Sequence, residues 1–261
     1  MPESSLERGV AVLRQFRRDR PTLAATDLAA ALAIPRSSLH RLLGEMVDLG
    51  LLRRTGDARY TLDAGVLLLG HACLASQDIV ALATPVLADL CARTGWTTNL
   101  AVRQGSAIIY LARSRGTGAV TENVSVGTSL PANATLMGRL LLSDMAAGNL
   151  RALYHGHVFG DRGDAVPSSL AALEAQLADD RTAPCLVSGG YYESGLAVVA
   201  APVREAGGRM VAAINATCAG SDARHAQALC PVVIEAADTL SSLLGAQPAA
   251  HTLNNGERAW A

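Results

Sequence analysis

One segment near the N-terminus constrains the fold of this chain more than any other. Between residues 36 and 47 the apolar side chains recur with the i, i+3, i+4, i+7 spacing that marks one face of an α-helix. These apolar residues are Leu39, Leu42, Leu43 and Met46. The opposite face is polar and carries Arg36, Ser37, Ser38, His40, Arg41 and Glu45. The segment therefore predicts an amphipathic helix that packs on one side and presents a polar surface on the other.

Two helices are expected before this segment. Ser4 and Glu7 match the capping box, in which a serine hydroxyl and a glutamate three residues later satisfy each other's backbone N–H groups, and a helical pattern follows them. Thr26 can cap a short second helix over residues 27–33, which Pro35 then ends.

A hairpin is expected after the amphipathic segment. Residues 51–54 and 59–62 have the pattern of two short strands, and a turn with Gly56 joins them. Three helices and a hairpin in this order are typical of a winged helix-turn-helix, whose third helix enters the major groove of DNA. The alternative is an ordinary surface helix with solvated side chains. The DNA-binding interpretation assigns contacts to Thr26, Arg36, Ser37, Ser38, His40, Arg41, Arg53, Arg54 and Arg59.

Charge is distributed unevenly along the chain. All 22 basic residues are arginine, and the formal net charge is −1. Residues 1–62 contain ten Arg and seven Asp or Glu, a net of +3, whereas the remainder contains twelve Arg and sixteen acidic residues, a net of −4. Phosphate contacts require a locally positive surface, so the N-terminal segment is the part expected to meet DNA.

The longer C-terminal part mixes helices with antiparallel hairpins. Residues 64–77 form a nearly uncharged helical pattern, which is expected to connect the two parts and to pack against a second subunit. Two hairpins are predicted, over 97–111 and 196–217. Further helices are expected over residues 78–93, from a cap at Asn133 or Thr135 to about 145, over 168–180 and over 222–244. Such a mixture indicates an α+β domain.

These patterns divide the chain into four parts. The predicted parts are a winged helix-turn-helix domain over residues 1–63, a linker helix over 64–78, an α+β domain over 79–246 and a tail over 247–261. From Gly245 onward the sequence contains Ala, Pro, Asn and Gly, and the tail is predicted to be disordered.

Several classes of protein are not expected. The five cysteines are odd in number and widely spaced, so neither a disulfide framework nor a zinc site is predicted. His155 and His157 lack a third ligand at suitable spacing, and no metal, cofactor or catalytic residue is predicted. No run of about 18 uncharged apolar residues occurs and the N-terminus is charged, so a cytoplasmic protein without membrane contact is expected.

Four stretches of the sequence resemble the IclR family of bacterial transcriptional regulators. Residues 5–13, SLERGVAVL, resemble the opening helix of that family. Residues 34–43, IPRSSLHRLL, resemble its recognition helix. Residues 126–139, VGTSLPANATLMGR, resemble the family's central motif, and residues 195–215 resemble its C-terminal hairpin. The resemblance extends from residue 5 to residue 244. It implies a GAF-like α/β effector-binding domain and a homodimer or homotetramer that binds a partly palindromic operator in double-stranded DNA.

The resemblance also implies a site for a small organic acid, between the start of the helix after the central motif and the C-terminal hairpin. It places six residues there: Leu136, Met137, Ser188, Val198, Asn215 and Thr217. Free N–H groups at the helix start suit a carboxylate, and the apolar members favour an aromatic acid over glyoxylate. Asn133 and Ser188 depart from the His or Tyr and the acidic residue that many members carry.

Two alternatives remain open at this point. The six residues could simply fill the core of the domain. The whole chain could be an enzyme or a small-molecule-binding protein whose N-terminal segment serves only for assembly, although no nucleophile and base can be assembled from the sequence.

Overall fold

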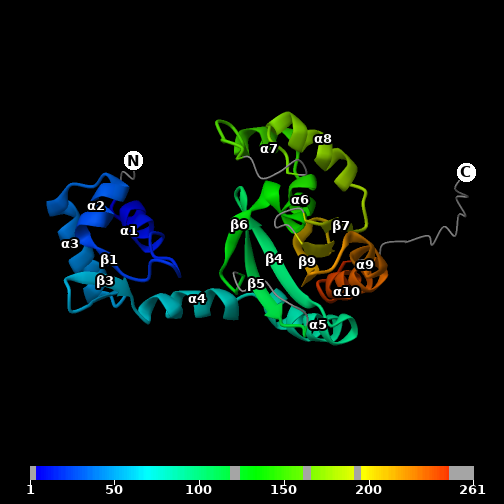
Figure 1. Cartoon of the computed structure of the whole chain (residues 1–261), viewed down its shortest axis with the longest axis horizontal. Helices are drawn as coiled ribbons and strands as arrows, with labels where there is room; N and C mark the ends of the chain where they lie inside the picture. Colours follow the sequence, from blue (N-terminus) through cyan, green and yellow to red (C-terminus); the bar gives the residue numbers. More distant parts are fainter. Residues whose placement is uncertain (1–3, 118–123, 161–165, 191–194, 247–261) are drawn as a thin grey trace, which may run out of the picture. The chain divides into compact units, whose positions relative to one another are not determined.

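The computed structural model describes residues 4–117, 124–160, 166–190 and 195–246 (Figure 1). Contacts divide the chain into two compact units, Met1–Gln77 and Asp78–Ala261. The tail predicted over residues 247–261 lies outside the described residues.

The first unit is a small helical domain with a three-stranded sheet. Its elements are α1 (Ser5–Leu13), β1 (Leu23–Ala24), α2 (Ala25–Leu32), α3 (Arg36–Asp48), β2 (Leu52–Arg54), β3 (Arg59–Leu62) and α4 (Gly65–Ala75). The strand order is β1-β3-β2, and all pairs are antiparallel. The apolar face of α3 packs against Val12, Leu28 and Tyr60, so the predicted stripe of this helix is confirmed.

The helix starts in this unit are partly as predicted. The capping box of α1 is confirmed, because the Glu7 N–H donates to Ser4 Oγ over 3.1 Å and the Ser4 N–H donates to Glu7 Oε2 over 2.9 Å. The predicted cap at Thr26 is wrong. Helix α2 begins at Ala25, and the Asp27 carboxylate accepts a hydrogen bond from the Ala24 N–H over 3.3 Å. Thr26 is instead an exposed residue of the first turn.

The second unit is built on a six-stranded antiparallel sheet with the order β6-β5-β4-β9-β8-β7. Its strands are β4 (Thr97–Gln104), β5 (Ala107–Ser114), β6 (Ser129–Pro131), β7 (Leu186–Gly189), β8 (Leu196–Arg204) and β9 (Met210–Ala219). Its helices are α5 (Asp78–Thr94), the 3₁₀ turn η1 (Ala132–Ala134), α6 (Leu136–Ser143), α7 (Ala147–Leu153), α8 (Leu170–Asp180), α9 (Ala223–Ala228) and α10 (Cys230–Leu243). Both predicted hairpins are confirmed, and their inner strands β4 and β9 pair with each other.

Helices cover both faces of this sheet (Figure 1). Helix α6 packs on β8 and β9 from one side, which we call the inner face, and α8 packs on α6. Helices α5 and α10 pack on the other face, where Thr98 Oγ1 donates to the Leu87 carbonyl of α5 over 2.8 Å. Residues along each strand alternate between the two faces, so Ala101 and Ala213 contribute to the core under α6.

One helix of this unit starts at a predicted cap, and one predicted helix is divided into two. Asn133 and Thr135 were the two predicted caps of α6, and Thr135 is the one observed. Its hydroxyl accepts a hydrogen bond from the Gly138 N–H over 3.1 Å. The single helix predicted over residues 222–244 is wrong, since α9 ends at Ala228 and α10 begins at Cys230. Pro231 lies in the first turn of α10, where its missing N–H is tolerated, and it disfavours continuation of the preceding helix.

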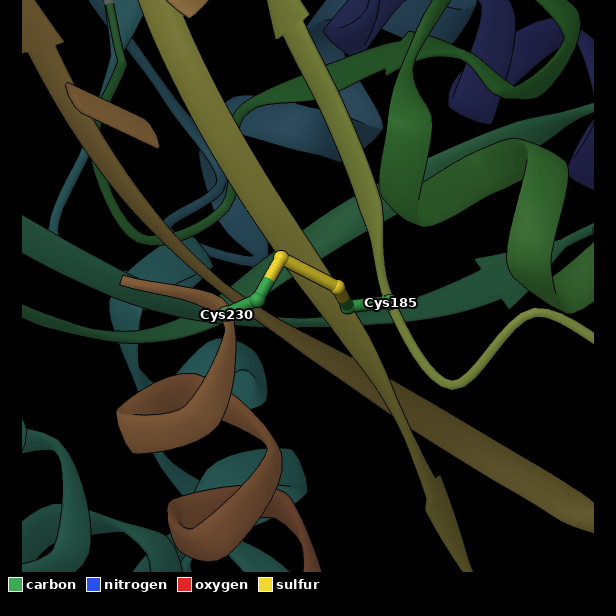
Figure 2. The surroundings of a disulfide bond; sticks show 2 residues. All are labelled: Cys185 and Cys230. Carbon is green, nitrogen blue, oxygen red and sulfur yellow. A yellow bond between two sulfur atoms is a disulfide. The ribbon is translucent and has the colours of Figure 1, made fainter. Parts of the chain in front are cut away.

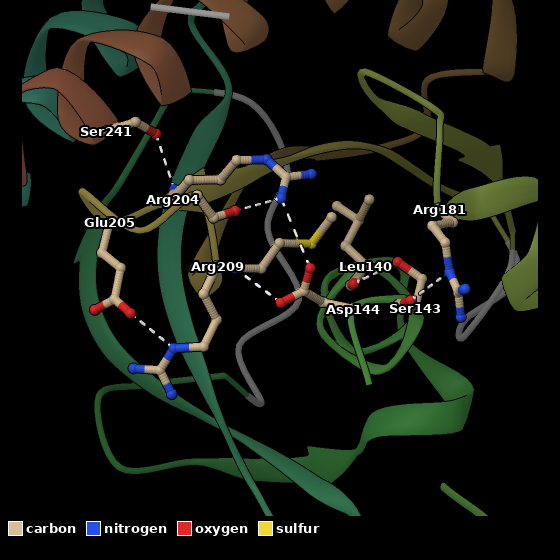
Figure 3. A network of polar contacts seen from close by, with 10 residues as sticks. Leu140, Ser143, Asp144, Arg181, Arg204, Glu205, Arg209 and Ser241 are labelled. Atoms are coloured by element: carbon tan, nitrogen blue, oxygen red, sulfur yellow. Dashed lines mark hydrogen bonds and ion pairs between the residues drawn. The ribbon is translucent and has the colours of Figure 1, made fainter. Parts of the chain in front are cut away.

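Polar contacts hold the C-terminal end of α6 to the second hairpin, and the hairpin to α10 (Figure 3). The Asp144 carboxylate accepts from the Met210 N–H over 3.0 Å and lies 3.7 Å from the Arg204 guanidinium. Ser241 of α10 accepts from the Arg204 N–H over 3.0 Å. A buried ion pair, Arg139–Asp180, joins α6 to α8 with 2.7 Å between Nε and Oδ2. Helix α6 is therefore fixed on the sheet at several points.

A disulfide joins Cys185, just before β7, to Cys230 at the start of α10 (Figure 2). The two Cα atoms are 6.4 Å apart, within the usual range for such a bond. The expectation of no disulfide is thus wrong. The cysteines are 45 residues apart in the sequence, and the packing of α10 on β8, the strand that pairs with β7, brings them together. Cys73, Cys91 and Cys218 are free.

No single helix in the described ranges is long and apolar enough to cross a membrane. Helices α4 and α5 reach the necessary length and hydropathy only when they are counted together, across the break between them.

Candidate DNA-binding face and effector site

Helix α3 presents an uninterrupted polar surface. Its buried side is apolar, whereas Arg36, Ser37, His40 and Arg41 are exposed and Ser38 is half-buried. Gly44 continues this surface one turn further, and nothing lies within 4 Å of the position where a Cβ would be. The exposed side chains can reach base edges or phosphates, which is the chemistry expected of a recognition helix.

The start of α3 is also open to an anion. Pro35 occupies the N-cap position and provides no side-chain hydrogen bond. The first intrahelical bond that enters the helix runs from the Leu39 N–H to the Pro35 carbonyl over 2.9 Å, so the N–H groups of the first turn lack intrahelical acceptors. Ser37 and Ser38 lie in this turn. Backbone and hydroxyl donors at the positive end of a helix are suited to bind phosphate.

The three wing arginines are not equivalent. Arg53 and Arg54 of β2 are exposed; Arg53 makes a long contact of 4.0 Å with Asp63, and Arg54 lies over the Tyr60 ring at 5.8 Å. Arg59 of β3 is half-buried, and its guanidinium donates to the Thr22 carbonyl over 3.0 Å. Arg59 therefore has a hydrogen-bond partner in the domain and is half-buried, whereas Arg53 and Arg54 are exposed.

The strand registers bring the predicted effector residues of the sheet into two neighbouring rows on the inner face. Thr217 is opposite Val198, and Val198 is opposite Ser188. Asn215, two residues before Thr217, occupies the next row, opposite Ala200. Ala200 belongs to the same core cluster as Leu136 and Met137 at the start of α6. Residues from α6, β7, β8 and β9 are thus gathered around one side of the sheet.

Three further polar residues share these rows and were not predicted from the sequence. Asn99 of β4 is directly opposite Asn215, and Thr97 is opposite Thr217. Arg113 of β5 is opposite Asn99 on its other side. We call Thr97, Asn99, Arg113, Asn215 and Thr217 the polar band. Asn99 lies two residues before Ala101 and directly before the apolar run of residues 100–102, and this two-residue spacing is the signal in the sequence that could have placed it on the inner face.

The polar band contains hydrogen-bonding groups that the described chain leaves unsatisfied. The Asn99 amide donates to Asn215 Oδ1 over 2.8 Å, but Asn99 Oδ1 is buried and accepts no hydrogen bond from the described residues. Arg113 Nε and Nη1 are likewise buried without an acceptor there. Burial, with the nearby positive charge of Arg115, lowers the pKa of Arg113. The Thr217 hydroxyl is already engaged, because it donates to the Thr97 carbonyl over 3.4 Å.

Metal chemistry receives no support from the described ranges, in which no cluster of three or more His, Cys, Asp or Glu residues could hold an ion.

Comparison with known families decides what kind of protein carries this fold. The model of the IclR helix-turn-helix domain matches residues 5–56, and the model of the bacterial transcriptional regulator IclR C-terminal domain matches residues 71–242. The chain belongs to the IclR family. It is therefore a transcriptional regulator with a DNA-binding helix-turn-helix domain and a C-terminal effector domain.

Individual IclR-family relatives are moderately similar. The Pca regulon regulatory protein of Pseudomonas putida is 32% identical over 81% of this chain and 73% of its own length. The transcriptional regulator XynR of Escherichia coli K12 is 29% identical over 81% of this chain and 84% of its own. A structure of an IclR homolog from Microbacterium hydrocarbonoxydans, complexed with 4-hydroxybenzoate, superposes with a TM-score of 0.76 at 27% identity, over 92% of this chain and 99% of that one.

Proposed function

We propose that this regulator binds its operator through α3 and the wing, and that an aromatic carboxylate bound in the C-terminal domain controls the binding. The polar band is the observation that carries the effector part of the proposal. It offers unsatisfied donors and an acceptor beside the apolar residues Leu136, Met137 and Val198, which suits an acid with an apolar body. The 4-hydroxybenzoate complex of a family member supports this class of ligand.

Six predicted effector residues belong to this proposed site. Leu136 and Met137 supply N–H groups at the start of α6 and apolar contacts, and Val198 supplies an apolar wall. Ser188, Asn215 and Thr217 lie on neighbouring strands and supply polar groups.

The DNA-binding part of the proposal rests on exposure and charge. Arg36, Arg41 and His40 contact bases or phosphates, and Ser37, Ser38 and Thr26 bind phosphate from the first turns of α3 and α2. Arg53 and Arg54 reach the DNA backbone from the wing. Arg59 contributes mainly by fixing the wing to the segment before β1, through its bond to Thr22.

Self-association is the third part of the proposal. Helix α4 exposes three consecutive leucines, Leu67, Leu68 and Leu69, with exposed fractions of 74%, 71% and 62% in the single chain. An apolar helix surface of this kind favours a protein partner. A partly palindromic operator requires a symmetric protein, so α4 is proposed as part of the contact in a homodimer or homotetramer.

Fluorescence anisotropy with labelled DNA that flanks the regulator's own gene tests the proposal. At one fixed salt concentration, we expect an operator fragment to bind at least about 1,000-fold more tightly than random DNA. Benzoate or a hydroxybenzoate should change this affinity, whereas pyruvate and glyoxylate should not. Equal binding of both DNAs would contradict the operator assignment, and a response only to the keto acids would contradict the aromatic effector.

A further inference from the structure

Arg113 is a cation with an unusual environment. It lies on β5 opposite Asn99 and faces the inner side of the sheet. The residue as a whole is half-buried, but its Nε and Nη1 atoms are buried without an acceptor among the described residues. Burial lowers the pKa of Arg113, and the nearby positive charge of Arg115 lowers it further. Buried cations in proteins are normally paired, because desolvation of an unpaired charge is costly. A cation retained in this state is suited to a ligand that brings the missing anion.

Asn99, opposite Arg113, has a buried acceptor without a hydrogen-bond donor among the described residues. The residue is only 3% exposed, and its side-chain amide nitrogen donates to Asn215 Oδ1. Its Oδ1 atom is an acceptor without a donor in the described chain. Arg113 therefore lacks an acceptor, and Asn99 lacks a hydrogen-bond donor, among the described residues. The two residues are directly paired on neighbouring strands.

We infer that Arg113 binds the carboxylate of the effector and that Asn99 Oδ1 accepts a hydrogen bond from a second group of the same ligand, such as a hydroxyl. The effector is then a hydroxy-substituted acid rather than a simple one. This inference rests on the proposed function, since it assigns atoms of the effector to residues of the polar band. It adds two residues, on β4 and β5, to a site that the sequence placed on α6, β7, β8 and β9.

The energetic consequence separates a ligand-binding role from a structural one. A guanidinium that stabilises the fold would cost stability when removed. A guanidinium that is paired only when a ligand binds costs stability in the ligand-free protein. Arg113→Met should therefore leave the melting temperature of the ligand-free protein unchanged or raise it. The same variant should no longer be stabilised by the acid, because binding to the native state is what raises the melting temperature.

Calorimetric titration of the full-length protein with benzoate, its three hydroxy isomers and neutral benzamide tests the inference. We expect Arg113→Met to weaken binding of the acids by about 100-fold or more, and Arg113→Lys to retain part of the affinity through its charge. Benzamide should bind the wild type weakly. At least one hydroxy isomer should bind about five-fold more tightly than benzoate, and Asn99→Ala should remove that advantage.

Arg103→Met is the matched control. Arg103 lies on the same sheet and its loss changes the net charge equally, but it is opposite Ile108, five residues and about 16 Å along β5 from Arg113. Its effect on acid binding should stay within about three-fold. If the wild type binds the acids and Arg113→Met or Arg113→Lys binds them as tightly, the anchor is overturned while the proposed function stands. If the wild type binds none of the acids, both fail. A melting temperature several degrees lower for ligand-free Arg113→Met would also overturn the assignment, because it would show a structural role.

Discussion

The side-chain amide of Asn99 on β4 donates a hydrogen bond to the side-chain oxygen of Asn215 on β9, with 2.8 Å between nitrogen and oxygen. The two residues are direct partners across the strands, and their exposed fractions are only 3% and 4%. Each comes from a different hairpin of the sheet. The bond therefore links the two hairpins by side chains as well as by the backbone.

Replacement of Asn215 should destabilise the C-terminal domain. Asn215→Ala leaves the Asn99 amide without its acceptor, and a buried unsatisfied group costs about 1 to 3 kcal/mol. We expect a decrease of this size in the free energy of unfolding measured with urea. Asn149→Ala, at an exposed position of α7, is the control and should change little. Equal stability of the Asn215 variant and the wild type would show that the buried bond contributes nothing.

Replacement of either recognition-helix arginine should weaken operator binding. Arg36→Ala and Arg41→Ala should each cost about 1 to 3 kcal/mol if the side chain makes a bidentate base contact. Anisotropy titrations at fixed salt measure the change, with circular dichroism to confirm folding. Arg151→Ala, which removes an exposed charge from α7, should have no effect on the operator. Wild-type affinity in both α3 variants would remove this helix from the interface.

Gly44 offers a test in which stability and DNA affinity change in opposite directions. A glycine inside a helix costs about 1 kcal/mol relative to alanine, and nothing within the chain occupies the space beside Gly44. Gly44→Gln should therefore stabilise the folded domain yet weaken operator binding, because the new side chain projects from the proposed DNA-binding face. Gly148→Ala in α7 is equally open and should gain stability without any effect on DNA. Tighter operator binding by Gly44→Gln would refute this orientation of α3.

Loss of the disulfide should lower stability. Cys185→Ser and Cys230→Ser each open a loop of 45 residues and should reduce the free energy of unfolding by about 2 to 4 kcal/mol under non-reducing conditions. The difference from the wild type should disappear when a reductant is present. Cys73→Ser, at an exposed free cysteine, is the control. Identical urea midpoints for the wild type with and without reductant would contradict the prediction.

Local patterns in the sequence predicted the elements that depend on local forces. The apolar stripe of α3, the capping box at Ser4 and the cap at Thr135 all involve residues within one or two helical turns. Thr26 was assigned as a cap wrongly because a threonine and the following aspartate were both compatible with a helix start. Asp27 supplies the contact from inside the helix.

Elements that depend on distant partners were not predictable in the same way. The edge strands β6 and β7 are three and four residues long, too short for a clear alternation. Arg113 and Asn99 are 14 positions apart, and only the β4–β5 register shows that they are opposite each other on the inner face. Cys185 and Cys230 likewise meet only through tertiary packing. The proposed ligand site is therefore assembled by pairings between distant residues that a single sequence does not display.

The bond between Cys185 and Cys230 makes part of the effector domain a closed covalent ring. The ring contains β7, β8, β9 and α9, and thus Ser188 and Asn215, whereas Asn99 and Arg113 lie outside it. A peptide bond broken anywhere between residues 186 and 229 would open the ring without releasing a fragment, so the two cut ends would remain parts of one molecule. One half of the proposed ligand site thus has a covalent continuity that the other half lacks.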